Sequence, residues 1–153
     1  MRPWLSTGKR KGAKSASSRR RDPRTGEAVV ILDVDQFASI RRRHGSWAGE
    51  QVTHAVADCL RGRLRTGDRL ALLRDDEFLA VLPGAAEPAL EPISRRLREA
   101  VTGLRLALAG QVWTLSCTIG AAARGSQQRS LEGLVRAADT ALHRAREADA
   151  CAR

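Results

Sequence analysis

The hydrophobic and polar positions along this chain predict strands and helices that alternate after a polar beginning. Residues 28–32 form a continuous apolar and β-branched run, which is typical of a strand buried on both faces. Shorter apolar runs come in pairs around an acidic turn and around Gly110, so each pair predicts a hairpin. The predicted strands are residues 28–32, 69–73, 78–82, 104–109 and 112–122.

Helical periodicity fills the intervals between these strands. Apolar residues spaced three and four apart predict a long helix over residues 48–64, after a shorter one that ends before Gly45. Ser130 is placed to cap the last helix, because its hydroxyl oxygen can accept from a free N–H of the first turn. The predicted helices are residues 36–44, 48–64, 88–104 and 131–148.

The order of these elements predicts an α+β sandwich with a mostly antiparallel central sheet flanked by helices. We expect the runs at 28–32, 69–73, 78–82 and 112–122 to share that sheet. A chain of 153 residues with 42% hydrophobic content is long enough for one domain with its own core. No apolar run approaches the roughly 18 residues of a membrane helix. The N-terminus also lacks the apolar stretch of a signal peptide, so we expect a cytoplasmic protein.

The net charge of +10 is concentrated at the N-terminus. Residues 1–24 hold nine Lys or Arg and one acidic residue, whereas the remaining 129 residues carry an excess of only two positive charges. Because this beginning is polar and rich in Gly and Ser, we predict a basic, disordered tail over residues 1–26 and a domain over residues 27–153. Such a tail can contact nucleic acid without sequence specificity, and the alternative is a solubilising or mis-assigned start.

Two acidic motifs lie where predicted strands end. The first is LDVDQF at residues 32–37, and the second is RDDEF at residues 74–78. Carboxylates in such places can share a hard cation, because Mg²⁺ binds through one or two carboxylates together with substrate phosphates. Each motif alone is equally well explained as a solvated polar turn. Their order along the chain favours a metal site.

Together the motifs resemble those of the GGDEF family, the diguanylate cyclases and their degenerate relatives, over about residues 27–146. The signature Gly-Gly-Asp-Glu-Phe falls on residues 74–78. The family's Thr-x-Ser-Ile-Gly strand is similar to residues 116–120, and its last helix is similar to residues 138–146. The chain enters its first strand without the helix that normally precedes it, so we expect an N-terminally truncated member.

The resemblance implies a site whose metal carboxylates are retained. In the family, two domains placed face to face join two GTP molecules into cyclic di-GMP with the help of metal ions. Asp33 and Asp76 match the metal carboxylates, and Val34 would add its backbone carbonyl. Glu77 matches the carboxylate near the attacking hydroxyl, so Asp76 and Glu77 are the implied catalytic residues. The implied cofactor is Mg²⁺ or Mn²⁺.

Positions that contact the substrate in the family are changed here. Arg74 and Asp75 replace the signature glycines, which let the backbone approach phosphates and adopt φ > 0. Arg41 stands at the guanine-reading Asn, and Glu50 stands at its partner Asp. Arg146 stands at a phosphate-binding Lys and keeps the charge. Because a site that hydrogen-bonds a base loses much affinity when its partners change, we predict weakened substrate binding.

The family's inhibitory product site also has a counterpart in this chain. Its Arg-x-x-Asp motif matches Arg65 and Asp68, and an arginine on the following helix matches Arg96. Arginine binds guanine edges and phosphates through paired N–H groups, so the resemblance implies a cyclic di-GMP site. A surface salt-bridge cluster is the alternative for these residues.

These features predict a degenerate GGDEF domain in cyclic di-GMP signalling. It would be a nucleotide-binding regulatory module for GTP or cyclic di-GMP, with weak or absent cyclase activity. One alternative is an active variant cyclase that makes cyclic di-GMP from two GTP molecules. A second alternative is a nucleic-acid-binding protein that acts through its basic tail. No segment predicts a coiled coil, so we expect at most a weak homodimer.

Overall fold

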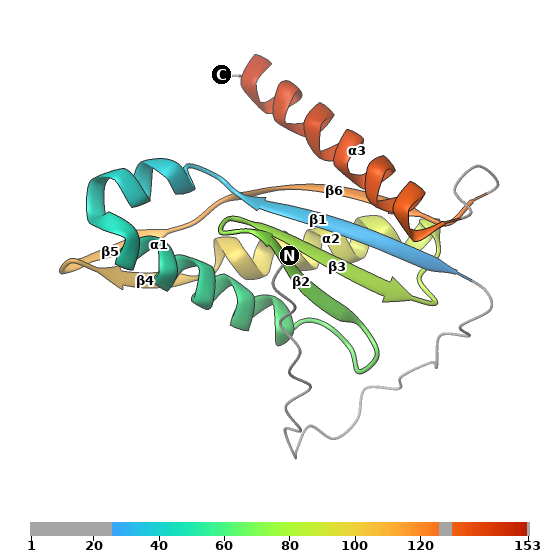
Figure 1. Ribbon diagram of the computed structural model, residues 1–153, viewed down its shortest axis with the longest axis horizontal. Coiled ribbons are helices and arrows are strands. Elements are labelled where there is room, and N and C mark those ends of the chain that lie inside the picture. Colours follow the sequence, from blue (N-terminus) through green and yellow to red (C-terminus); the bar gives the residue numbers. More distant parts are fainter. Residues whose placement is uncertain (1–25, 126–129, 153) are drawn as a thin grey trace.

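The structure is a computed structural model that describes residues 26–125 and 130–152. Nearly all of the predicted basic tail therefore lies outside the described residues. The elements, shown in Figure 1, are β1 (Glu27–Val34), α1 (Phe37–Arg61), β2 (Arg69–Arg74), β3 (Glu77–Pro83), α2 (Glu87–Thr102), β4 (Arg105–Leu108), β5 (Gln111–Thr114), β6 (Cys117–Ala123) and α3 (Leu131–Cys151). Among the described helices, none combines the length and the apolar character that crossing a membrane requires.

An antiparallel sheet with the strand order β2-β3-β1-β6 forms the centre of the domain. β1 is hydrogen-bonded to β3 on one edge and to β6 on the other, which explains its continuous apolar sequence. The helices α1 and α2 pack on one face of the sheet, and α3 crosses the other face over β6 and β1 (Figure 1). This is the α+β sandwich expected from the sequence.

The prediction that residues 112–122 form a single strand of this sheet is wrong. The chain breaks at Leu115 and Ser116, so only β6 joins the sheet, while β4 and β5 form a separate two-stranded hairpin. The physical reason is that Ser116 is held at the end of β1. Its carbonyl oxygen accepts from the N–H of Asp35 at 3.0 Å, and its hydroxyl donates to the Asp35 carboxylate at 2.7 Å. The hairpin extends beyond the sheet, where Val112 is 70% exposed.

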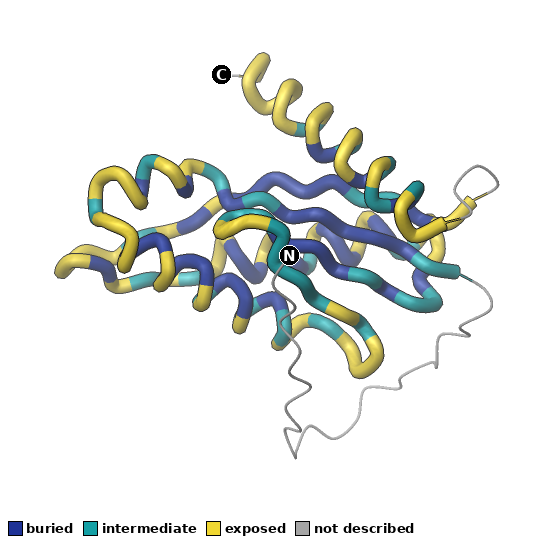
Figure 2. Tube along the Cα trace, in the orientation of Figure 1, coloured by how far each residue is buried: buried dark blue, intermediate teal, exposed yellow. Residues whose placement is uncertain are grey.

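Alternation along β1 divides its side chains between two apolar layers. Figure 2 shows that the central strands are buried along most of their length. The residues facing α1 and α2 are Ala28, Val30, Leu32 and Val34. The residues on the opposite face are Val29 and Ile31, which pack with Leu134, Ala138 and Leu142 of α3. Since side chains two residues apart share a face, Asp33 continues the set that faces α3.

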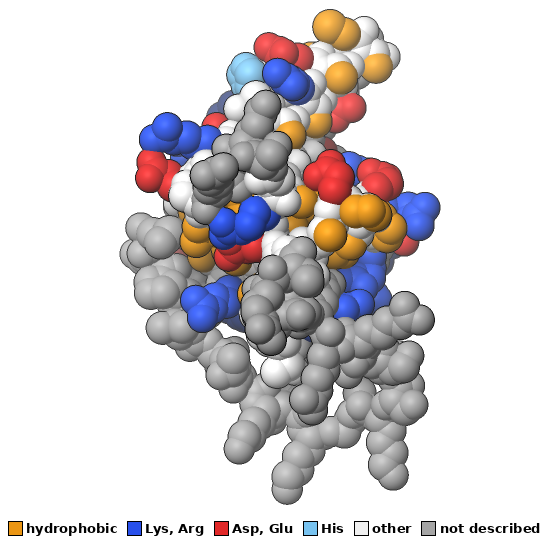
Figure 3. Space-filling view, turned by 90° about the vertical axis from the view of Figure 1, so that its right-hand side faces the viewer, with side chains coloured by type: hydrophobic (Ala, Val, Ile, Leu, Met, Phe, Trp, Pro, Cys, Tyr) orange, Lys and Arg blue, Asp and Glu red, His pale blue; other side chains and the backbone are white. Residues whose placement is uncertain are grey.

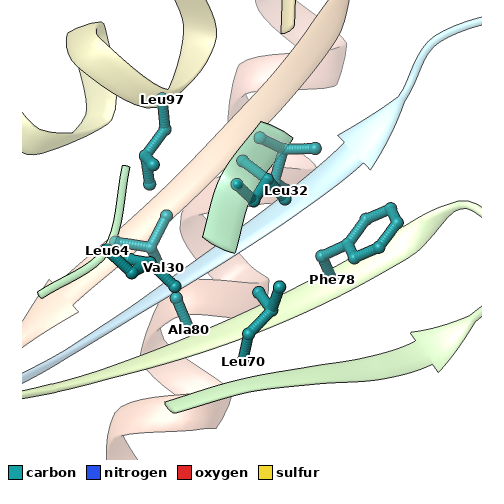
Figure 4. A pocket seen from close by; sticks show the side chains of 8 residues that line it. Val30, Leu32, Leu64, Leu70, Phe78, Ala80 and Leu97 are labelled. Carbon is teal, nitrogen blue, oxygen red and sulfur yellow. The ribbon is translucent and has the colours of Figure 1, made fainter. Parts of the chain in front are cut away.

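A small gap remains in the layer beneath α1 and α2 (Figure 4). Its lining is entirely apolar and includes Val30, Phe78 and Leu97, whose side chains converge from β1, β3 and α2. The gap measures about 10 Å³, which is about the smallest space that can hold one water molecule. A space this small and apolar belongs to core packing and offers no room for a ligand.

The predicted helix break at Gly45 is a kink inside α1. Gly45 has φ 83° and ψ 174°, a combination that residues with a side chain rarely adopt. The predicted helices over 36–44 and 48–64 are therefore two arms of one segment, and the second arm ends slightly earlier than predicted. The first arm carries Arg41 and the second carries Glu50, so the kink lies between these two predicted substrate positions.

Candidate functional site

The end of β1 brings Asp33 together with the second acidic motif. Asp33 is paired with Glu77 across the ladder of β1 and β3, and the N–H of Val34 donates to the carbonyl oxygen of Asp76 at 2.9 Å. Burial raises the pKa of Asp33 to about 6, and the positive charge of Arg146 opposes this shift. The charges of Asp76 and Glu77 reinforce it, so these carboxylates influence Asp33 directly.

Arg146 of α3 contacts this acidic cluster. Its guanidinium group forms an ion pair with the carboxylate of Asp33. The Asp33 side chain is 15% exposed and that of Arg146 is 42% exposed, so the pair is partly shielded from water. Asp33 faces α3, and Arg146 lies about one helical turn beyond the buried Leu142. The fold therefore positions the pair.

The second acidic motif forms the turn between β2 and β3. β2 ends at Arg74 and β3 begins at Glu77, which leaves Asp75 and Asp76 in the turn. Among the described residues, a positive φ outside glycine occurs only at two positions in other segments. The turn therefore closes without the φ > 0 that glycines would permit at positions 74 and 75. Arg74 and Asp75 change the turn through the charge and volume of their side chains.

Two of the predicted substrate positions meet over this turn. Nη1 of Arg41 lies 3.4 Å from Oδ2 of Asp75, and both side chains are more than half exposed. The guanidinium carbon of Arg41 also lies 6.0 Å from the ring centroid of Phe37. From the second arm of α1, the hydroxyl of Thr53 donates to the carbonyl oxygen of Asp75 at 2.6 Å. The turn is thus tied to both arms, while Glu50 is exposed on α1.

Asp35 has a structural role that the sequence analysis did not assign. Its carboxylate accepts hydrogen bonds from the hydroxyls of Ser116 and Thr118 at 2.7 Å and 2.9 Å. These contacts fasten the end of β1 to the beginning of β6. The only sequence signal is a pair of hydroxyl residues near a strand end, and such pairs are common on solvated strands. Thr53 was also missed, because a hydroxyl in a helix usually bonds within that helix.

The donors at the end of β1 fit a hard divalent cation. Asp33 and Asp76 offer carboxylate oxygens, and Val34 offers a backbone carbonyl, the ligand types that Mg²⁺ and Mn²⁺ prefer. Among the charges that shift the pKa of Asp33, Arg146 is the cation, and the anions are Asp76, Glu77 and Asp35. Within the described part of the chain, no group of three or more His, Cys, Asp or Glu side chains converges on a metal position. A cation here would complete its shell with carbonyl, water and ligand oxygens.

In the predicted product site, Arg65 and Asp68 lie in the turn before β2, and Arg96 lies on α2. The N–H of Arg65 donates to the carboxylate of Asp68 at 2.8 Å, and the N–H of Asp68 donates to the carbonyl oxygen of Arg65 at 3.0 Å. These bonds close a tight turn before β2 in which Gly67 has φ 98°. Arg96 lies on α2, where its Nε is buried without a hydrogen-bond partner in the described structure. Asp68 thus shapes the turn, and Arg65 is exposed on it.

Comparison with known proteins gives consistent matches to one type of domain. The family model described as diguanylate cyclase, GGDEF domain, matches residues 10–150. The chain is 32% identical over 120 residues to the diguanylate cyclase DgcP of Pseudomonas aeruginosa, which covers 78% of this chain and 18% of DgcP. It is 31% identical over 122 residues to the cyclic di-GMP phosphodiesterase PdeR of Escherichia coli, with coverage of 78% and 18%. The chain therefore spans about a fifth of the length of these relatives.

Solved structures share the fold. The GGDEF domain of YfiN (TpbB) from Pseudomonas aeruginosa is 31% identical with a TM-score of 0.75, covering 81% of this chain and 78% of that one. A sensory box/GGDEF family protein from Caulobacter crescentus is 29% identical with a TM-score of 0.74, covering 80% of each chain. The GGDEF domain of DgcB from Caulobacter crescentus, solved with c-di-GMP, has a TM-score of 0.75 over 81% of this chain and 74% of that one. At 21% identity, this last likeness concerns the fold alone.

Proposed function

The chain belongs to the GGDEF domain family, and on this premise we propose that it is a degenerate member in cyclic di-GMP signalling. It binds GTP together with a divalent cation and acts as a regulatory module with weak or absent cyclase activity. The observation that carries the proposal is the ion pair of Arg41 with Asp75. It joins two positions that depart from the family pattern, and it lies over the turn where glycines would let phosphates approach the backbone.

The retained residues support binding of a metal-bound nucleotide. Asp33, Asp76 and the carbonyl of Val34 would hold the cation, which neutralises phosphate charge and activates the attacking hydroxyl when it is bound. Glu77 lies opposite Asp33 on the ladder and would be the carboxylate that accepts the hydroxyl proton. Arg146 reaches the same end of the sheet from α3 and would contact the phosphates.

The changed residues weaken the productive arrangement of the substrate. A like charge added at 4 Å costs about 1 kcal/mol in water and about 4 kcal/mol at an effective dielectric constant of 20. Because the Asp75 side chain is 70% exposed, its repulsion of a triphosphate belongs at the lower end of that range. Arg41 offsets part of this charge, but its guanidinium has only donors and cannot replace an amide that both donates and accepts.

Restoring the family residues tests the loss of activity. The full chain and a variant with Arg41→Asn, Glu50→Asp, Arg74→Gly and Asp75→Gly are incubated with GTP and Mg²⁺ or Mn²⁺, and cyclic di-GMP is measured by chromatography. We expect little or no product from the natural chain and clear product from the fourfold variant. Adding Asp76→Ala to that variant should remove the product. Product from the natural chain that disappears in Asp76→Ala would contradict the proposal and favour an active variant cyclase.

We also propose that cyclic di-GMP binds through Arg65, Asp68 and Arg96. Charge-assisted hydrogen bonds from each arginine should contribute roughly 1.5–3 kcal/mol toward an anionic ligand. Calorimetry of the full chain should show saturable binding that weakens at least tenfold in Arg65→Ala. Arg136→Ala is the matched control, because Arg136 is an exposed arginine on α3. Absence of heat with the natural chain would contradict this part of the proposal.

Nucleic-acid binding through the basic tail is the second candidate function. The eight excess positive charges of residues 1–24 favour it, because phosphate contacts supply most non-specific affinity. The remaining 129 residues carry an excess of only two positive charges, and acidic and basic side chains are intermixed on the face shown in Figure 3. Equal DNA binding by the full chain and by a chain that begins at Glu27 would exclude the tail as the contact.

The expected weak homodimer stays a prediction, which sedimentation at several protein concentrations would test.

A further inference from the structure

Arg146 of α3 forms an ion pair with Asp33, beside the other carboxylates at the end of β1. We infer that Arg146 is the resident counter-charge of this cluster and that a divalent cation binds there strongly only together with nucleotide phosphates, which draw the guanidinium away from Asp33. The inference rests on the proposed nucleotide-binding function and adds a regulation of the same site.

The fold holds this contact in place from both sides. Asp33 is the second-to-last residue of β1, a strand that is buried along most of its length, and it continues the face that carries Val29 and Ile31. Arg146 follows Leu142, which is 1% exposed against that same face. The helix also approaches β6 closely at Gly120, where an added Cβ would meet helix backbone. The preceding turns of α3 are therefore packed against the sheet, and the long side chain of Arg146 extends from this packed part of the helix toward Asp33.

The guanidinium and a divalent cation compete for the same carboxylate. A cation on Asp33 would place two further positive charges beside Arg146. In a partly shielded site such repulsion exceeds its value in water, because the effective dielectric constant is lower. Arg146 must therefore leave Asp33 before a cation can bind well. Leaving is unfavourable unless the guanidinium finds another anion.

Phosphates are a suitable second partner for Arg146. A guanidinium binds phosphate through two parallel N–H groups at least as well as it binds a carboxylate. A nucleotide at this site would therefore favour the released position of Arg146 and so favour the cation. By linkage, nucleotide and cation then raise each other's affinity by the same factor. A neutral side chain at position 146 should strengthen binding of the cation alone and weaken binding of the phosphates. These changes have opposite signs, and a general loss of structure cannot produce both.

The experiment measures Mn²⁺ binding by the full chain through the electron paramagnetic resonance signal of free Mn²⁺. Each titration is done with and without a GTP analogue whose α,β-bridge is a methylene group, so that it cannot be cyclised, and the Mn²⁺ that the analogue binds without protein is measured separately and subtracted. The neutral variants are Arg146→Gln and Arg146→Met, and Arg146→Lys keeps the charge. Arg136→Gln is the matched control, because it removes an arginine of α3 whose ion pair with Glu132 is local and exposed. Circular dichroism verifies the fold of each variant.

We expect the neutral variants to bind Mn²⁺ alone about tenfold more tightly than the natural chain, a value between those of exposed and buried ion pairs. The factor by which the analogue raises Mn²⁺ affinity should fall by about the same amount. Arg146→Lys keeps the positive charge, so it should bind Mn²⁺ alone as weakly as the natural chain. Arg136→Gln should behave like the natural chain in both titrations.

Two results would overturn the inference and leave the proposed function standing. The first is an equal affinity for Mn²⁺ alone in the natural chain and the neutral variants, with binding of the analogue intact. The second is a natural chain that binds Mn²⁺ equally well with and without the analogue, and this measurement needs no variant. If neither the natural chain nor any variant binds Mn²⁺ or the analogue, the inference and the proposed function are both wrong.

Discussion

Replacing Gly120 by alanine tests how α3 is held against the sheet. Gly120 lies in β6 opposite Ile31 of β1, and α3 passes directly over it. A Cβ at this position would overlap the carbonyl oxygen of Ala138 and the backbone nitrogen of Leu142, and it would lie 2.7 Å from the Cα of Leu142. These atoms belong to helix backbone, so no side-chain rotation can relieve the overlap.

The cost follows from the movement that the extra methyl group requires. Ordinary contact between carbon atoms is about 3.5–4.0 Å, so α3 must shift outward by about 1 Å. The shift would loosen the α3 layer, which consists of Leu134, Ala138 and Leu142 against Val29 and Ile31. Overpacked positions usually cost about 1–3 kcal/mol, and we expect about 3 kcal/mol here because the whole helix face is affected. That is a large part of the roughly 5–15 kcal/mol by which a domain is stable.

Urea unfolding followed by circular dichroism measures this loss. Gly62→Ala is the matched control, because Gly62 has φ −64° and the nearest atom to an added Cβ lies at 3.5 Å. We expect the control to be neutral or more stable by up to about 1 kcal/mol, since alanine restricts the unfolded chain more than glycine does. A free energy of unfolding for Gly120→Ala within about 1 kcal/mol of the natural chain would refute the close approach of α3.

Three further predictions concern other parts of the domain. Burial raises the pKa of Cys117 to about 12, so its thiol should resist a thiolate-directed reagent at pH 8 in the folded protein. The exposed Cys151 should react at once under the same conditions. Rapid labelling of Cys117 without denaturant would contradict its burial. Asp35→Ala should lower the free energy of unfolding by about 2–3 kcal/mol in urea titrations, because it leaves two hydroxyls of the β6 region without their charged acceptor. A double-mutant cycle on Arg41 and Asp75 should give a coupling of about 0.2–1 kcal/mol that shrinks at high salt, and a larger or salt-independent coupling would show that the pair is more buried than described.

Much of the fold could be predicted from the sequence because its signals are local. The continuous apolar run of β1 indicates a strand covered on both faces, and the structure confirms it. The acidic turn between two apolar runs indicates the β2–β3 hairpin. Gly45 indicates a helix break, because backbone with φ near 83° excludes most other residues. In each case the cause lies within a few residues of the element, so a sequence pattern can reveal it.

The contacts of the candidate site depend on tertiary structure. The run at 112–122 is split because Ser116 bonds to Asp35, a residue far away in the chain, and no periodicity records such a bond. In the same way, the sequence shows Arg146 as one more charge on a helix. Its partner Asp33 is decided by which face of β1 meets α3 and by the close approach of that helix to the sheet. The sequence alone determined which acidic and basic residues this protein has and which elements carry them. Packing decided which of them touch, because strand register and helix crossing bring together side chains that the chain itself keeps far apart.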